Sequence, residues 1–246
     1  IFQKVPHKNV IYFTISLIFS IFAAKKQYME RFIMQDLIAW KNREDRKPLI
    51  LLGARQVGKT YILKEFGQRE FENVAYINCD NNAMAKDLFA SDYNIDRILL
   101  TIGAITGVNI EAGKTLIIMD EIQELHRGLA SLKYFCENAR EYHVAVAGSL
   151  LGLSLHQGES YPVGKVNTLE MYPMTFEEFL WARGFKQRMD LLQHGMWDVV
   201  KSLRTLYIQH LREYYLVGGM PEAVNKFIET NDANAVREVQ EEIIRA

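Results

Sequence analysis

The feature that most constrains this chain is residues 53–60 (GARQVGKT), which match the pattern GxxxxGK[ST] of a P-loop. The short apolar run at residues 48–53 predicts a strand buried on both faces, and the apolar spacing across residues 59–66 predicts a helix. Glycines let the backbone wrap closely around phosphates, and the N–H groups at a helix start point toward them. A loop between a buried strand and a helix therefore predicts a phosphate-binding site.

Within this loop, Lys59 is expected to reach the β- and γ-phosphates of bound ATP, and the Thr60 hydroxyl to coordinate Mg²⁺. The other residues expected to surround the nucleotide are Gly53, Ala54, Arg55, Gln56, Val57 and Gly58. The side chains of Arg55 and Gln56 could also face solvent or a neighbouring subunit. The predicted cofactors are thus ATP and Mg²⁺.

A second apolar run, residues 116–119, ends in Asp120 and Glu121. In open α/β sheets, ligands bind at the C-terminal ends of the strands, where these carboxylates are expected. We expect Asp120 to hold magnesium through its water shell and Glu121 to polarise the attacking water as a general base. Alone, the pair is often a strand end entering a solvated turn. Together with the loop, the pair indicates ATP hydrolysis. A small-molecule kinase is disfavoured because Glu121 favours water as the acceptor and the sequence shows no acceptor-binding site.

Further candidates have less specific patterns. Ser149 follows a predicted strand at residues 144–147, so it is expected near the γ-phosphate, although a simple strand-end turn is the alternative. Lys165 and Arg183 are candidates for stabilising phosphate charge, in cis or in trans. Trp40, Trp181 and Trp197 stand in helical contexts and are expected to be packing anchors.

The order of elements predicts an α/β fold with a doubly wound parallel sheet. Further strands are expected at residues 74–77 and 166–171, with helices between strands, for example at residues 129–142. After Pro173 the pattern becomes helical: Thr175 and Glu178 have capping-box spacing, and a break at residues 218–221 interrupts the helical spacing. We therefore expect a P-loop ATPase domain at residues 29–172 and a small helical lid domain at residues 173–246.

Residues 1–28 form a hydrophobic N-terminal extension that is not expected to join the fold. Its apolar run at residues 10–24 fits a secretion signal, a membrane anchor, or sequence upstream of the true start. We favour the third interpretation because Met29 precedes the predicted domain and an ATP-dependent enzyme has its fuel in the cytoplasm. A cytoplasmic location is therefore expected.

The chain's charge and cysteines argue against a strongly basic nucleic-acid-binding protein, a disulfide framework and a zinc site. With a net charge of -1 and a pI near 6.7, the chain is not strongly basic, so a nucleic-acid partner would need a local patch. Cys79 and Cys136 are far apart and match no metal-ligand spacing, so two buried thiols are expected.

With these motifs in hand, the chain resembles a prokaryotic family of AAA+-type ATPases whose P-loop domain precedes a nuclease-like C-terminal domain of unknown function. The matching segments are residues 53–60, 118–123, 147–149, 162–165, 172–180 and 218–223. The resemblance implies an ATP-binding core with a helical lid, in which a Gly-x-Pro turn places Pro221 against the nucleotide base. Family members often carry arginine where this chain has Lys165, and lysine lacks the planar fork of an arginine finger.

The chain stops at Ala246 within an apparent helix, so the resemblance also implies a further C-terminal domain that is missing here. A protein or DNA partner would act through that domain, and a homo-oligomer is an open alternative. Two functions remain at this point. One is Mg-dependent ATP hydrolysis coupled to lid or partner movement. The other is a nucleotide-dependent switch or scaffold with negligible hydrolysis.

Overall fold

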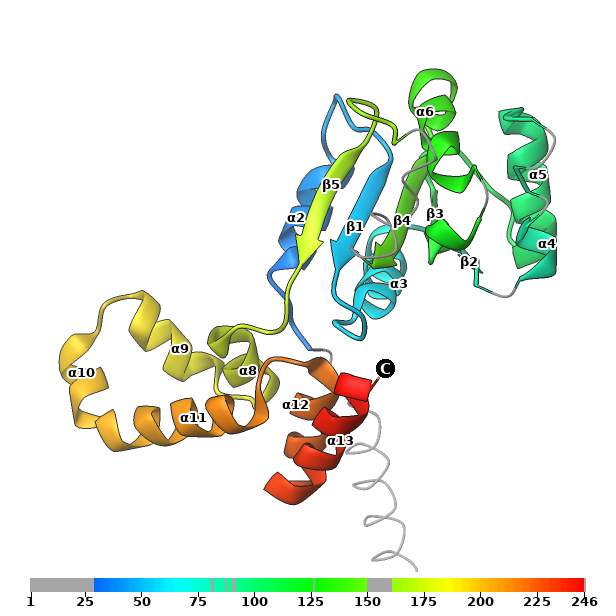
Figure 1. The fold of residues 1–246 in the computed structure, drawn as a ribbon. Coiled ribbons are helices and arrows are strands. Elements are labelled where there is room, and N and C mark those ends of the chain that lie inside the picture. Colours follow the sequence, from blue (N-terminus) through cyan, green and yellow to red (C-terminus); the bar gives the residue numbers. More distant parts are fainter. Residues whose placement is uncertain are drawn as a thin grey trace, which may run out of the picture.

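The computed structural model describes residues 29–80, 82–86, 88–89, 92–125, 127–149 and 161–245 (Figure 1). The predicted N-terminal extension at residues 1–28 lies outside these ranges. Among the helices they contain, none is long and apolar enough to cross a membrane.

A five-stranded parallel sheet forms the centre of the N-terminal part (Figure 1). Its strands are β1 (Leu49–Gly53), β2 (Asn73–Asn78), β3 (Thr115–Asp120), β4 (His143–Ser149) and β5 (Asn167–Met171). Their order is β2-β3-β4-β1-β5, so β4 separates the strand before the P-loop from the strand that ends in the two carboxylates. The predicted parallel α/β fold of a P-loop protein is therefore confirmed.

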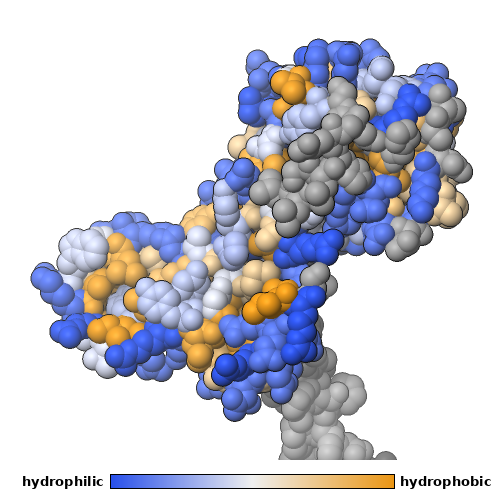
Figure 2. All heavy atoms as spheres, viewed as in Figure 1, coloured by the Kyte–Doolittle hydropathy of each residue, from blue (hydrophilic) through white to orange (hydrophobic). Residues whose placement is uncertain are grey.

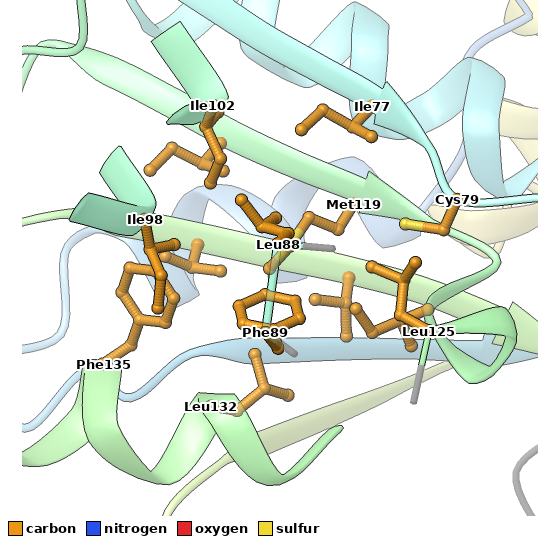
Figure 3. Close-up of a cluster of buried hydrophobic side chains, with 14 of the residues drawn as sticks. Ile77, Cys79, Leu88, Phe89, Ile98, Ile102, Met119, Leu125, Leu132 and Phe135 are labelled. Atoms are coloured by element: carbon orange, nitrogen blue, oxygen red, sulfur yellow. The ribbon is translucent and has the colours of Figure 1, made fainter. Parts of the chain in front are cut away.

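Helices cover both faces of the sheet because successive side chains of each buried strand point to opposite faces. On β3, Ile117 and Met119 join the core cluster beneath the helices at residues 95–106 and 128–138, and Leu116 and Ile118 join the cluster beneath the helices at residues 33–41 and 59–70. Figure 3 shows the first cluster, which is closed by side chains such as Phe135. The helices of this part are α2 (Ile33–Lys41), α3 (Lys59–Glu70), α4 (Ala83–Lys86), α5 (Ile95–Thr106) and α6 (Gly128–Asn138), with a 3₁₀ turn η1 (Ile122–Glu124).

After β5 the chain is helical, with a separate core cluster built around side chains such as Phe179 and Phe227. This helical segment, residues 173–245, comprises α8 (Phe176–Ala182), α9 (Lys186–Gln193), α10 (Trp197–Ser202), α11 (Arg204–Val217), α12 (Pro221–Thr230) and α13 (Ala233–Arg245). It begins with the predicted capping box: the Glu178 N–H donates to Thr175 Oγ1, and the Thr175 N–H donates to Glu178 Oε2. The change from sheet to helices thus falls where the sequence predicted it, whereas the division into two domains stays a prediction.

Two local predictions are wrong. The helix expected at residues 129–142 ends at Asn138, because Ala139 leaves helical geometry with a φ of -152°. Trp197 is 60% exposed and anchors no core, in contrast to Trp40, which is buried as expected.

Hydrophobic residues are visible on the surface of the helical segment (Figure 2), and the exposed ones there include Met196 and Tyr215. Both cysteines are buried and free, as predicted.

Candidate nucleotide-binding site

Residues 53–60 connect β1 to α3 and border a cleft of about 560 Å³. Gly58 precedes the first helical residue with a φ of 98°, and Gln56 has a φ of 61°. Glycine adopts such left-handed geometry at little cost, whereas Gln56 stores roughly 1–2 kcal/mol of backbone strain. The loop therefore turns back so that the N-terminus of α3 opens onto the cleft. The cleft is lined by Arg55, Gln56, Gly58, Lys59, Thr60, Asp80, Glu121, Gln123 and Glu124.

Gly53 marks a close approach between β1 and β5 at the base of the loop. A Cβ atom at this position would lie 2.4 Å from the carbonyl oxygen of Met171, a distance that real Cβ atoms essentially never show. The first glycine of the motif is thus required by strand packing as well as by the turn.

Lys59 is buried and spans the loop. Its Nζ donates to the carbonyl oxygens of Gly53 at 2.9 Å and Ala54 at 2.8 Å. Burial lowers the pKa of Lys59 below its usual value, and the carboxylates of Glu121 and Asp120 partly offset that change. The ammonium group is therefore held inside the loop at the place where phosphate charge is expected.

Thr60 and Asp120 meet although they come from different elements. Thr60 Oγ1 donates to Asp120 Oδ2 at 2.5 Å, and the Tyr76 hydroxyl donates to the same oxygen at 3.3 Å. Burial and the Asp120 carboxylate raise the pKa of Tyr76 to about 12, so this hydroxyl keeps its proton. The structure thus brings together the hydroxyl and the carboxylate that the sequence predicted as magnesium ligands. It adds Tyr76, for which no local sequence pattern gave a signal.

Glu121 has left-handed backbone geometry, with a φ of 52°. Its N–H donates to Asp120 Oδ1 at 3.1 Å, and its carboxylate accepts a 2.5 Å hydrogen bond from Gln123 Nε2. A non-glycine residue in this region stores roughly 1–2 kcal/mol, and such strain concentrates at functional sites. Gln123 was not predicted. The amide oxygen of Gln123, Oε1, is buried without a hydrogen-bond partner in the part of the chain that is described.

Ser149 ends β4 and pairs in register with Gly53. It is buried at the base of the loop, and it is not among the described residues that line the cleft. Its predicted place near a γ-phosphate stays a prediction.

Pro221 begins α12 and lies against the P-loop. A Cβ atom built on Gly58 would be 3.7 Å from Pro221 Cγ, so the proline ring lies beside Gly58 with room for about one methyl group between them. The turn before Pro221 is held by a 2.6 Å hydrogen bond from the Met174 N–H to the Gly219 carbonyl. The helical segment therefore lies beside the loop at the residue that the resemblance indicated, and contact with a base is untested.

Lys165 lies at the wrong end of the sheet to act on the P-loop of its own chain. It precedes β5, whose first residue, Asn167, pairs with Leu49, and Gly53 lies at the other end of β1. A strand rises about 3.3 Å per residue, which separates the two ends by about 13 Å. Lys165 pairs instead with Glu137 at 2.8 Å. The prediction that Lys165 acts in cis is wrong.

Arg183 is engaged within the helical segment. Its guanidinium pairs with Glu213 and lies over the rings of Phe179, Phe185 and Phe227. These contacts occupy the side chain, and Arg183 is not among the described residues that line the cleft, so its role in stabilising phosphate charge, in cis or in trans, stays a prediction.

Comparison with known proteins assigns the family. The model of an AAA domain matches residues 45–180, which is more than half of the chain. The chain belongs to this AAA domain family. Its parallel sheet and P-loop accordingly place it in the ATPase-like class of nucleotide-binding proteins.

A curated relative of this AAA domain protein is the uncharacterized protein MJ1637 of Methanocaldococcus jannaschii, which is 27% identical over 225 residues. The match covers 85% of this chain and 45% of the relative, so the chain spans less than half of that protein's length.

Two solved structures are more distant. A Thermotoga maritima RuvB K64R mutant is 20% identical with a TM-score of 0.39, covering 68% of this chain and 52% of that one. Aeropyrum pernix Orc1 in complex with DNA is 14% identical with a TM-score of 0.44, covering 89% and 68%. Likeness at this level transfers no function to the AAA domain chain.

Proposed function

We propose that this AAA domain protein binds ATP with Mg²⁺ in the cleft beside residues 53–60 and hydrolyses it. The observation that carries the proposal is that Lys59, Thr60 and Glu121 line one cleft, while Asp120 at the end of β3 accepts hydrogen bonds from both Thr60 and the Glu121 N–H. This arrangement combines a cation for phosphate, oxygen donors for a metal and a carboxylate beside them.

The oxygen donors at the cleft fit Mg²⁺. Thr60 Oγ1 and Asp120 Oδ2 lie 2.5 Å apart, and Mg²⁺ prefers oxygen ligands while keeping several waters. Among the described residues no group of three or more His, Cys, Asp or Glu side chains could hold a metal. None is needed here, because phosphate oxygens and water supply most ligands of a nucleotide-bound ion. When bound, the ion would neutralise charge on the phosphates.

Lys59 is proposed to exchange its two carbonyl acceptors for phosphate oxygens. Hydrogen bonds between ionised partners are stronger than those to neutral carbonyls, so the exchange favours bound phosphate. The Gly53 and Ala54 carbonyls then lose a donor, which would make the geometry of the loop depend on its occupancy.

Glu121 is proposed to accept the proton of the attacking water. Oxygen of that water forms a bond to the γ-phosphorus while the bond from phosphorus to the bridging oxygen breaks, giving ADP and inorganic phosphate. Gln123 supports this role because its 2.5 Å hydrogen bond fixes the Glu121 carboxylate. A general base contributes about 10²–10⁴-fold to such a step.

Glu121→Gln tests the hydrolysis directly, with phosphate release measured alongside equilibrium binding of ATP. We expect turnover to fall by about 10²–10⁴-fold while ATP still binds. Lys59→Ala is expected to lose binding itself. Glu111→Gln, which changes a carboxylate on a surface turn paired with Lys114, is the matched control and should match the wild type. Equal turnover in Glu121→Gln and wild-type protein would show that Glu121 is not the base.

The Gln123 contact also favours a second candidate, a switch that binds ATP and hydrolyses it negligibly. In that case Gln123 would hold Glu121 away from the water, and Gln123→Ala would raise turnover above that of the wild type. For the whole protein, the proposal also includes movement of the helical segment, a protein or DNA partner, assembly with further copies and a cytoplasmic location.

A further inference from the structure

Arg31 is a buried arginine at the meeting point of three segments, just before α2. It is 8% exposed. Its Nη1 donates to the Val57 carbonyl in the P-loop at 3.3 Å, and its Nη2 donates to the Tyr172 carbonyl after β5 at 2.6 Å. One guanidinium therefore connects the N-terminal segment to the P-loop and to the chain entering the helical segment.

The third partner of Arg31 is Glu178 in the first turn of α8. Arg31 Nε lies 3.1 Å from Glu178 Oε1, an ion pair without the alignment of a hydrogen bond. The same carboxylate accepts from the Phe32 N–H at 2.7 Å and from the Thr175 N–H at 2.9 Å. Both charges are almost fully buried, so loss of either partner would leave an uncompensated charge. The ion pair therefore connects α8 to the segment before α2, whose Arg31 also contacts the P-loop.

The contact with Val57 has a consequence for phosphate binding. The peptide between Val57 and Gly58 is trans, so its C=O and N–H groups point in opposite directions. Arg31 holds the carbonyl, and this orients the Gly58 N–H to the opposite side of the peptide, where it would donate to a phosphate bound in the loop. Gly58 has a φ of 98° and no side chain that restricts its rotation, so the contact from Arg31 helps to keep the peptide in one orientation.

We propose that Arg31 is a positioning residue that presets the P-loop for phosphate and, through Glu178, makes phosphate binding and the placement of α8 depend on one another. This inference rests on the proposed ATP binding. Arg31 does not touch phosphate in this scheme, because its guanidinium contacts the carbonyl on the opposite side of the peptide. Any change in the Val57 carbonyl on nucleotide binding reaches α8 through a single side chain.

The test compares ATP affinity and steady-state kinetics in Arg31→Gln, Arg31→Lys, Glu178→Gln and Lys41→Gln. Arg31→Gln should raise both the Kd and the KM for ATP by about tenfold, with kcat changed less, since it weakens charge-assisted contacts that preset binding. Arg31→Lys should recover part of the affinity because it keeps the charge but not the planar fork. Glu178→Gln should also weaken ATP binding, although Glu178 lies outside the cleft lining.

Lys41→Gln is the matched control. It removes the Lys41–Glu70 ion pair of 3.1 Å, which joins α2 to the end of α3 remote from the P-loop. Its affinity for ATP should stay within twofold of the wild type. All binding is measured below the unfolding transition of each variant. If Arg31→Gln does not fold, Arg31→Lys and Glu178→Gln carry the test.

A second measurement is the rise in Tm produced by ATP, which a purely structural role of the ion pair would leave unchanged. We expect a smaller rise in Glu178→Gln than in wild-type and Lys41→Gln proteins. If the Arg31 and Glu178 variants fold and show the wild-type Kd for ATP and the wild-type rise in Tm, the inference is wrong and the proposed ATP binding still stands. Wild-type protein that binds no ATP would overturn the proposed function, and the inference with it.

Discussion

Gly219 packs its backbone directly against the start of the helical segment, so Gly219→Ala is a severe test of that packing. A Cβ atom there would lie 2.3 Å from the Met174 carbonyl oxygen and 2.9 Å from the Met174 nitrogen. Both are backbone atoms, which cannot rotate away. The chain would have to move by about 0.7 Å to restore even the 3.0 Å that real Cβ contacts reach. The conflict is purely steric, because the φ of Gly219 is not left-handed.

The cost of Gly219→Ala has two parts. Overpacking of this kind costs about 1–3 kcal/mol. The displacement also weakens the 2.6 Å hydrogen bond from the Met174 N–H to the Gly219 carbonyl, which adds about 0.5–1.5 kcal/mol. We expect a loss of about 2–4 kcal/mol in the free energy of unfolding and a Tm lower by about 5–15 °C. Because Pro221 lies two residues further on and beside Gly58, ATP affinity should fall as well.

Urea and thermal unfolding measure the stability change, and Gly107→Ala provides the control. Gly107 has a φ of 69° at the end of α5, and a Cβ there would meet nothing within 4 Å. Its substitution therefore introduces only backbone strain of about 1 kcal/mol and should leave ATP affinity unchanged. If Gly219→Ala destabilises the protein no more than Gly107→Ala does, the close approach at Met174 does not constrain this turn.

Three further predictions concern single side chains. Thr60→Val should raise the Mg²⁺ concentration needed for ATP turnover by about tenfold or more, whereas Thr60→Ser should not; a metal titration of turnover checks this. Burial, with the charges of Arg46 and Lys41, lowers the pKa of His143 from 6.5 to about 4. The unfolded chain therefore binds the extra proton between these pH values, and about 3 kcal/mol of stability is lost as pH falls through them; unfolding of His143→Phe should lack that loss. Thr175→Ala should cost about 1 kcal/mol by removing the cap of α8, measured by urea unfolding against Thr175→Ser.

The parts of the fold that were predictable from the sequence are those set by contiguous residues. The strand expected at residues 116–119 is observed as Thr115–Asp120, because an uninterrupted apolar run bounded by polar residues has few alternatives in a parallel sheet. The capping box at Thr175 was predictable for the same reason, since both partners lie within four residues. The end of α6 was not, because no glycine or proline marks it.

Residues that support the site from a distance left no pattern in the sequence. Tyr76 contacts Asp120 across 44 positions, and Arg31 contacts Val57 across 26. Such pairs arise only when the strand order and the packing of α2 are fixed, and neither follows from periodicity. Lys165 is the converse case, a residue that the sequence suggested for the P-loop and that the structure places elsewhere. It follows the candidate motifs closely in sequence, yet the parallel register of β5 places it at the other end of the sheet.

The contacts of the P-loop with the helical segment converge on one peptide. Val57 is held by Arg31, which also holds α8 through Glu178, and the next residue, Gly58, lies beside Pro221 at the start of α12. α8 is thus linked to this peptide indirectly, through Glu178 and Arg31, and the start of α12 lies beside it. If ATP binding changes the orientation of this peptide, the proposal predicts that α8 and α12 shift with it. These contacts support the proposal that the helical segment responds to nucleotide at this peptide, independently of any partner.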